Sequence, residues 1–182
     1  MEEKICVFDL DGTLWKENSH IDIIHKYMKK SKLEKIIEKL YAFFGAKSYM
    51  NYLSRMYKKI PIDYIYNYAP PFRKTAIDIL NKKCSEGYKI ICISNAPEEI
   101  VREAGKRLGV EAYKAPIGKK ELILKEKFPV RKNLTVVTDN ISDKSILKMA
   151  DEGYIFTNKI RKKTFEKMGL DGNIYYLDSN RE

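Results

Sequence analysis

The sequence predicts an α/β fold, a doubly wound parallel sheet with a small helical segment inserted after the first strand. The first observation is a set of short apolar runs that each end at a polar loop: residues 5–8, 90–93, 134–137 and 153–156. Because these runs are continuous rather than alternating, they indicate strands buried on both faces, as in parallel sheets. The second observation is that helical patterns separate the runs, at residues 72–86, 98–108, 120–128 and 142–149. Alternating strands and helices are typical of doubly wound sheets.

A third observation is the segment 16–70, which breaks this alternation. Amphipathic patterns predict helices at 26–44 and 47–59, and a proline at position 61 begins a further short helix. We therefore predict a core unit formed by residues 1–15 and 71–182, with residues 16–70 as a helical insertion that caps it. The segment holds 11 Lys/Arg against 5 Asp/Glu and 8 of the 13 tyrosines, so it is basic and rich in aromatic residues.

Composition restricts the classes of protein that fit. With 182 residues, 44% hydrophobic and 33% charged, the chain suits one compact domain with a modest insertion. Its three cysteines form no CxxC pair, which favours a reducing, cytoplasmic location. No apolar run approaches the roughly 18 residues of a membrane span, so we expect no membrane role. The net charge of +10 admits nucleic acid or small anionic partners, but a lysine- and glutamate-rich surface of a heat-adapted protein also explains it.

Polar side chains follow three of the apolar runs within a few residues: Asp9 and Asp11 follow the first, Ser94 the second and Asp139 the third. In doubly wound sheets the site lies outside the carboxyl ends of the strands, so these side chains should converge on one edge. Each also has a structural alternative. Asp-x-Asp-x-Thr fits a turn after a strand, and Ser94 and Asp139 fit helix caps.

Four segments resemble, in order and spacing, the motifs of the haloacid dehalogenase superfamily. They are "FDLDGTL", the serine of "ICISN", a lysine of "IGKKELIL" and the aspartates of "VVTDNISD". Within that superfamily, the short helical insertion and the 24 residues between Ser94 and Lys119 resemble the phosphoserine phosphatase group.

The resemblance implies roles for individual residues. Asp9 would be the nucleophile that forms an aspartyl-phosphate, and Asp11 the general acid and base. The residues that would bind the substrate are Thr13, Ser94, Asn95, Lys119 and Arg55. Lys119 is the first choice for the lysine that meets the phosphate, with Lys120 and Lys114 as alternatives. Arg55, from the insertion, would meet a carboxylate or second phosphate of the substrate.

By the same comparison, Mg²⁺ would be held by the Asp9 carboxylate, the Asp11 backbone carbonyl and Asp139, since this cation prefers oxygen ligands. Asp143 would orient the metal waters or the lysine. The sequence departs from the family pattern at Thr138, where glycine is usual, and at Ser142, where asparagine is frequent. Ser19 stands where phosphoserine phosphatases carry a glutamate that meets the substrate amine, which argues against serine phosphate as the substrate.

These observations predict a Mg²⁺-dependent phosphatase that acts on a small phosphorylated metabolite. Dehalogenation is disfavoured, because attack on a carbon–halogen bond needs no acid at the position of Asp11. A phosphotransferase would share every motif and stays open. So does a protein that uses the basic cap to bind nucleic acid, or to act on nucleotide or polynucleotide ends. The sequence carries no signal for the oligomeric state.

Overall fold

The computed structural model describes residues 3–28, 41 and 45–179 of the chain. Contacts divide the chain into two compact units, Met1–Glu17 with Pro70–Glu182, and Asn18–Ala69. The larger unit contains the six described strands, whereas the described part of the smaller unit is helical. The role of the smaller unit as a cap over the site stays a prediction.

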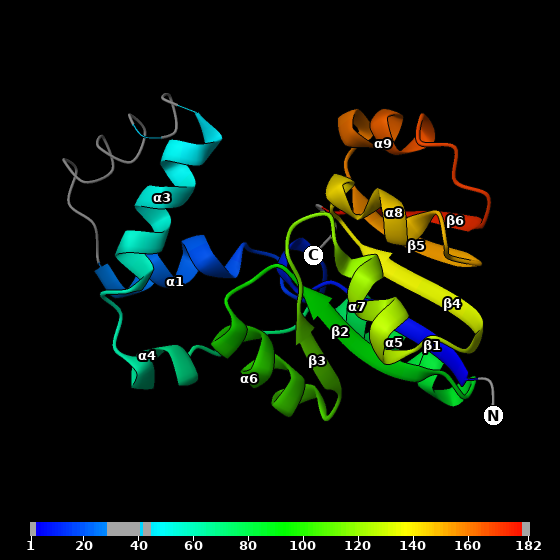
Figure 1. Cartoon of the computed structure of the whole chain (residues 1–182), viewed down its shortest axis with the longest axis horizontal. Coiled ribbons are helices and arrows are strands. Elements are labelled where there is room, and N and C mark those ends of the chain that lie inside the picture. Colours follow the sequence, from blue (N-terminus) through cyan, green and yellow to red (C-terminus); the bar gives the residue numbers. More distant parts are fainter. Residues whose placement is uncertain (1–2, 29–40, 42–44, 180–182) are drawn as a thin grey trace. The chain divides into compact units, whose positions relative to one another are not determined.

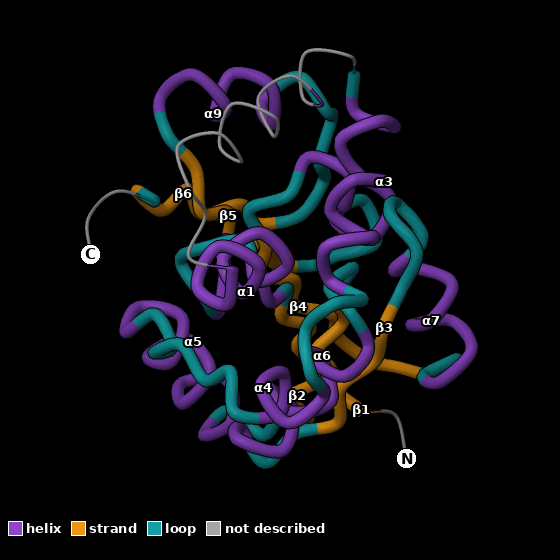
Figure 2. Tube along the Cα trace, turned by 90° about the vertical axis from the view of Figure 1, so that its left-hand side faces the viewer, coloured by secondary structure: helices purple, strands orange, loops and turns teal. Residues whose placement is uncertain are grey.

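The larger unit is built on a single parallel sheet (Figures 1 and 2). Its strands run in the order β3-β2-β1-β4-β5-β6. Their bounds are β1 Glu3–Phe8, β2 Lys89–Ser94, β3 Glu111–Lys114, β4 Arg131–Thr138, β5 Glu152–Thr157 and β6 Asn173–Asp178. This confirms the predicted doubly wound parallel sheet. The strand order reverses between β1 and β4, and such a switch point is where α/β sheets bind ligands.

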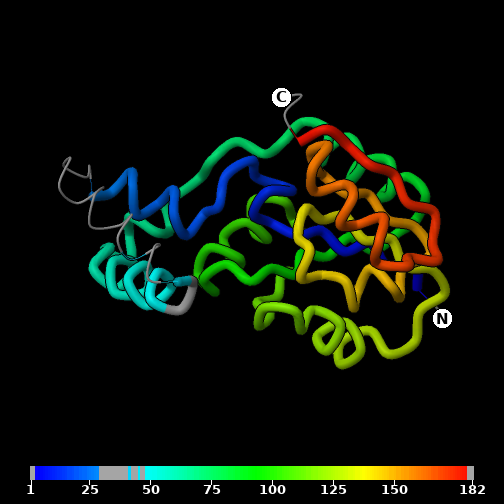
Figure 3. The backbone as a smooth tube through the Cα atoms, turned by 90° about the horizontal axis from the view of Figure 1, so that it is seen from above, coloured from blue at the N-terminus to red at the C-terminus, as the bar shows by residue number. Residues whose placement is uncertain are grey.

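Helices cover both faces of this sheet. They are α5 Lys74–Ser85, α6 Glu98–Leu108, α7 Lys120–Lys127, α8 Lys144–Leu147 and α9 Lys159–Glu166. Figure 3 shows α7 and α8 on the face opposite α5. One core cluster packs Leu124 of α7, Leu147 of α8 and Phe165 of α9 against strand residues that include Val7 and Val136. Burial of these side chains ties the three helices to the sheet that carries the site.

The structure differs from the sequence prediction mainly in the two edge strands of the sheet and in the helices near the C-terminus. Strands β3 and β6 and helix α9 were not expected. Both strands lie at an edge of the sheet and mix exposed with half-buried residues, so neither shows the continuous apolar run of a central strand. The helix predicted at 142–149 is instead a 3₁₀ turn, Ile141–Asp143, followed by the four residues of α8.

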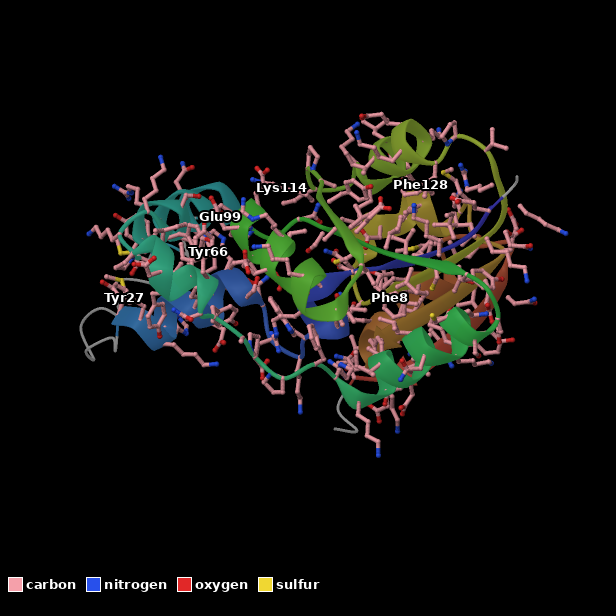
Figure 4. The ribbon with its side chains drawn as sticks, turned by 90° about the horizontal axis from the view of Figure 1, so that it is seen from below. Phe8, Tyr27, Tyr66, Glu99, Lys114 and Phe128 are labelled. Atoms are coloured by element: carbon pink, nitrogen blue, oxygen red, sulfur yellow. The ribbon has the colours of Figure 1, made fainter. Side chains whose placement is uncertain are left out.

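The smaller unit contains α1 Ser19–Met28, α3 Ala46–Tyr57 and α4 Ile62–Tyr66. The helix predicted at 26–44 lies almost wholly outside the described residues. Several tyrosines contact neighbours of the same unit. Tyr57 packs edge-on to His20, with ring centroids 5.1 Å apart, and Tyr68 donates a hydrogen bond to Asp22. Figure 4 marks Tyr27, which packs against Tyr64 at 5.0 Å. These rings serve the unit's own packing.

Two further findings bear on the class of protein. All three cysteines are free, and Cys6 and Cys92 are buried. None of the described helices is long and apolar enough to cross a membrane.

Candidate active site

The first motif forms a tight turn at the end of β1, whose last residue, Phe8, is marked in Figure 4. The backbone N–H of Asp9 donates to the carbonyl of Val137 in β4 (2.9 Å), and the side-chain Oδ1 of Asp9 accepts from the N–H of Leu10 (2.8 Å). The following π-helical turn, Leu10–Leu14, is closed by a hydrogen bond from Trp15 N–H to Leu10 O. Asp9 is therefore fixed at the central strands, and its side chain is 4% exposed.

Lys120 provides the positive charge beside Asp9. Its Nζ lies 2.7 Å from Asp9 Oδ1 and 2.8 Å from Asp143 Oδ2, and its side chain is 2% exposed. Burial by itself would lower the pKa of Lys120, but the charges of Asp9 and Asp143 outweigh it and raise that pKa above the ordinary value. The ammonium therefore stays charged between two carboxylates.

This geometry favours the alternative Lys120 over the first choice, Lys119, as the lysine of the site. Lys119, the first choice from the sequence, is exposed and precedes the first residue of α7, whereas the alternative Lys120 is that first residue. Successive residues of a helix point about 100° apart, so one position decides which lysine faces the sheet. Lys114, the other alternative, ends β3 and is also exposed (Figure 4).

Asp143 is held by a second donor from β4. The hydroxyl of Thr138 donates to Asp143 Oδ2 (2.6 Å) and accepts from the N–H of Asn140 (3.0 Å). Asp143 is 1% exposed. Thr138, which departs from the usual glycine, thus orients the carboxylate that pairs with Lys120.

Asp139 lies directly against the first motif. Gly12 has φ +71°, and a Cβ added to it would meet the carboxyl carbon of Asp139 at 2.4 Å. Glycine is therefore required both by its backbone conformation and by this close approach. Burial, and next the charge of Asp9, raise the pKa of Asp139 to about 6, although the guanidinium of Arg161 acts in the opposite direction. Two carboxylates of like charge are thus brought together at this edge.

Arg161 is a member of the site that the sequence did not indicate. Its Nη2 donates to the backbone carbonyl of Asp139 (2.6 Å) and its Nη1 lies 3.3 Å from Asp139 Oδ2. In the sequence it belongs to the basic run "KIRKK", which is typical of a solvated helix surface. Only its contacts with Asp139 in the folded chain distinguish Arg161 from its neighbours.

Ser94 and Asn95 lie at the end of β2, the strand next to β1. Ser94 is buried, and its Oγ accepts from the N–H of Ala96 (3.2 Å). The side-chain amide of Asn95 donates to the carbonyl of Ala115 (2.8 Å), and Ala115 N–H donates back to Ser94 O (2.8 Å). Asn95 therefore fixes the loop after β3. Helix α6 begins only at Glu98.

Three buried polar atoms in these segments make no hydrogen bond to the described residues: Thr13 Oγ1, Ser142 Oγ and Asp143 Oδ1. Buried polar atoms normally have partners, so their clustering within the motif segments fits a place where water or ligand completes the bonding. Arg55 is the candidate residue that the sequence placed in the insertion. It belongs to the smaller unit, is exposed, and lies over the ring of Tyr41 at 5.7 Å.

The donor set fits a magnesium ion. Asp9 and Asp139 supply carboxylate oxygens, and the missing side chain of Gly12 leaves room for Asp139 to approach the first motif. The described residues contain no group of three or more His, Cys, Asp or Glu side chains placed to hold a metal. Mg²⁺ does not need such a group, because it usually keeps several waters and takes only one or two carboxylates from the protein.

Structural comparison supports the fold. The chain is similar to a protein of unknown function from Bordetella pertussis Tohama I, with a TM-score of 0.72, 10% identity and coverage of 96% and 98% of the two chains. It is also similar to a structure described as a phospho-aspartyl intermediate analogue of phosphoserine phosphatase (TM-score 0.68, 18% identity, coverage 98% and 94%). A substrate-bound phosphoserine phosphatase complex gives a TM-score of 0.64 at 17% identity, with coverage of 98% and 95%.

Sequence comparison identifies the family. A search of curated proteins finds no match. The family model for haloacid dehalogenase-like hydrolases matches residues 6–147, a span that begins within β1 and ends with α8. This span contains all four motif segments, so the chain belongs to the haloacid dehalogenase-like hydrolase family.

Proposed function

We propose that this protein is a Mg²⁺-dependent phosphatase that hydrolyses a small phosphomonoester through an aspartyl-phosphate on Asp9. The observation that carries the proposal is the buried contact between Asp9 and Lys120, which is itself braced by Asp143. A fixed positive charge beside a buried carboxylate suits phosphoryl transfer, where positioning and neutralisation of charge supply most of the catalysis.

In the first step, an oxygen of Asp9 attacks the phosphorus, and the bond between phosphorus and the ester oxygen breaks. Oδ1 already accepts from Leu10 N–H and Lys120, so Oδ2 is the oxygen assigned to the attack. Asp11 gives its proton to the leaving oxygen, which departs as an alcohol. In the second step, Asp11 takes a proton from water while the water oxygen attacks the phosphorus. The phosphorus–Asp9 bond then breaks, and inorganic phosphate and free Asp9 result.

Other residues of the site would hold the phosphoryl group. Lys120 supplies a point charge for its oxygens. The hydroxyls of Thr13 and Ser94 would supply hydrogen bonds, and Thr13 Oγ1 makes no hydrogen bond to the described residues. A magnesium ion held by Asp9, Asp139 and the Asp11 carbonyl would neutralise charge on the phosphoryl oxygens.

The substrate class follows from the same groups. Phosphoserine phosphatases occur among the similar structures. By the resemblance drawn from the sequence, Ser19 stands where that group carries a glutamate that meets the substrate amine, and Ser19 is fully buried at the start of α1. This supports a phosphorylated metabolite other than serine phosphate, with Arg55 as the residue that meets a second anionic group. The tyrosine contacts within the smaller unit favour packing over stacking on nucleic-acid bases.

The test is release of inorganic phosphate from a panel of phosphorylated metabolites, with and without Mg²⁺. Asp9→Asn should abolish release, because it removes the nucleophile on which the pathway depends. Asp78→Asn makes the same chemical change at an exposed position of α5 and should leave release unchanged. Comparable turnover by Asp9→Asn and the wild type would refute the mechanism. Transfer of the phosphate to an added alcohol in preference to water would instead identify a phosphotransferase.

A further inference from the structure

Arg161 binds the same carboxylate that the proposed function assigns to the metal. The guanidinium contacts Asp139 twice, at the backbone carbonyl (2.6 Å) and at Oδ2 (3.3 Å). Its side chain is 38% exposed, and that of Asp139 is 21% exposed. A carboxylate oxygen that accepts a hydrogen bond from an arginine is less available to a metal ion. Arg161 and the metal ion must therefore share Oδ2 of Asp139 or exchange at it.

The position of Arg161 is built by the fold. Asn158, which follows β5, accepts hydrogen bonds at Oδ1 from the N–H groups of Ile160 and Arg161 (3.0 and 2.9 Å) and so fixes the first turn of α9. Strand β5 pairs with β4, with Ile155 opposite Thr138, one residue before Asp139. The backbone of Arg161 is thus fixed by its bond to Asn158, and the pairing of β5 with β4 brings this turn near the end of β4.

The two contacts of Arg161 differ in kind. The hydrogen bond to the Asp139 carbonyl is short and does not depend on the state of the carboxylate. The contact with Oδ2 is longer, at 3.3 Å, and partly exposed, so it is the weaker of the two contacts. Arg161 can therefore give up Oδ2 while its bond to the carbonyl keeps the guanidinium near the site.

The charges around Asp139 explain why a counter-ion is useful. Its carboxylate lies against Gly12 and close to the charge of Asp9. Lys120, a buried cation whose charge also acts on Asp139, is already engaged by Asp9 and Asp143. If neither a metal ion nor another cation were near Asp139, the repulsion between Asp9 and Asp139 would destabilise this edge of the sheet.

We propose that Arg161 is a positioning residue that acts as a built-in counter-ion for Asp139, occupying Oδ2 in the metal-free protein and yielding it when Mg²⁺ binds. This inference rests on the proposed function. It makes Arg161 both a stabiliser of the metal-free state and a competitor that weakens Mg²⁺ binding, since its charge remains near the cation.

The experiment compares Arg161→Gln with Lys162→Gln. The control removes the same charge from the next residue of α9, whose amine lies 3.7 Å from Glu166 and is 45% exposed. Binding of Mg²⁺ to the metal-free protein is measured by calorimetry, and thermal unfolding is followed with and without Mg²⁺. Arg161→Gln should bind Mg²⁺ about tenfold more tightly, as expected when one nearby like charge is removed from a partly exposed site. Without Mg²⁺ it should melt at a lower temperature than the control.

Arg161→Lys provides a second variant that keeps the charge but loses the two-pronged contact. It should bind Mg²⁺ with an affinity between those of the wild type and Arg161→Gln. Equal or weaker Mg²⁺ binding by Arg161→Gln, relative to Lys162→Gln, would overturn the inference. So would a raised KM with unchanged Mg²⁺ affinity, which would assign the arginine to the substrate. If the wild type releases phosphate and binds Mg²⁺, either of these two results refutes the counter-ion role of Arg161 and leaves the proposed function intact. If the wild type neither releases phosphate nor binds Mg²⁺, the proposed function is refuted as well.

Discussion

The Nζ of Lys120 lies 2.7 Å from Oδ1 of Asp9, and both side chains are almost completely buried. This contact joins the first residue of α7 to the end of β1, two points 111 positions apart in the chain. Because Asp143 contacts the same ammonium, the lysine has no freedom to turn towards solvent.

Replacement of Lys120 tests which lysine serves the site. Lys120→Met should reduce phosphate release by about 10²–10³-fold, the loss typical of removing one preorganised electrostatic contact. Lys119→Met, one residue earlier and exposed, should retain activity within about twofold. Lys120→Met leaves the buried carboxylates of Asp9 and Asp143 without their cation, which destabilises the fold. Rates are therefore compared after circular dichroism shows that both variants are folded. If Lys119→Met lost more phosphate release than Lys120→Met, Lys119 would be the lysine that serves the site.

Gly12 tests the approach of Asp139 to the first motif. Gly12→Ala places a Cβ 2.4 Å from the carboxyl carbon of Asp139, in addition to the strain of φ +71°. Gly87→Ala carries the strain alone, because φ is +78° but no atom lies within 4 Å of the added Cβ. We expect the control to cost about 1–2 kcal/mol of unfolding free energy and to keep activity. Gly12→Ala should cost more and lose phosphate release. Equal effects of the two substitutions in urea unfolding and in turnover would contradict the close approach.

Thr138 tests the bracing of Asp143. Thr138→Val removes the hydroxyl that donates to Asp143 and accepts from Asn140 N–H. It leaves this N–H without that acceptor and Asp143 Oδ2 with Lys120 as its remaining donor. The expected cost is about 1–3 kcal/mol in urea unfolding, accompanied by slower phosphate release. Thr138→Ser keeps the hydroxyl, so it should retain most of the free energy of unfolding and most of the rate of phosphate release. A valine variant as stable and active as the serine variant would show that the hydrogen bond to Asp143 is dispensable.

A second buried lysine lies far from these motifs and gives a prediction for pH. Lys83 of α5 is 4% exposed and pairs with Glu152 and with Glu86. Burial would raise the pKa of Glu152, but hydrogen bonds from Lys83 and Tyr154 outweigh it and leave that pKa below the ordinary glutamate value. A lowered carboxyl pKa contributes stability that is complete above the ordinary glutamate range and is lost as the pH falls through the lowered value.

Lys83→Met should therefore destabilise the protein at pH 7 by about 1–3 kcal/mol, since it leaves two partly buried carboxylates without their cation. The difference from the wild type should shrink as the pH falls below about 4.5, where the unfolded glutamates take up protons. Urea unfolding at several pH values measures this. Lys82→Met, which removes an amine that is 62% exposed and 3.9 Å from Glu86, should cost little at any pH. A difference that stays constant down to pH 3 would contradict the ionic role of Lys83.

The sequence alone predicted the central sheet, because β1, β2, β4 and β5 are continuous apolar runs whose burial on two faces leaves a clear pattern. It did not predict β3 and β6, whose half-exposed residues resemble ordinary surface segments and pair only because a neighbouring strand is already in place. It likewise overestimated the helix after the fourth motif, where a 3₁₀ turn orients Asp143 towards Lys120.

The sequence was sufficient to identify the family. It also made Asp9, Asp11 and Asp139 candidates for the site, because they follow recognisable strands at fixed spacing. Which cations contact Asp9 and Asp139 becomes apparent only in the folded chain. In a chain with 35 lysines and arginines, local sequence does not separate Lys120 from Lys119, or Arg161 from Lys162. The choice depends on the direction in which a helix presents each side chain and on which strand end it meets, and these are fixed only when α7 and α9 pack on the sheet.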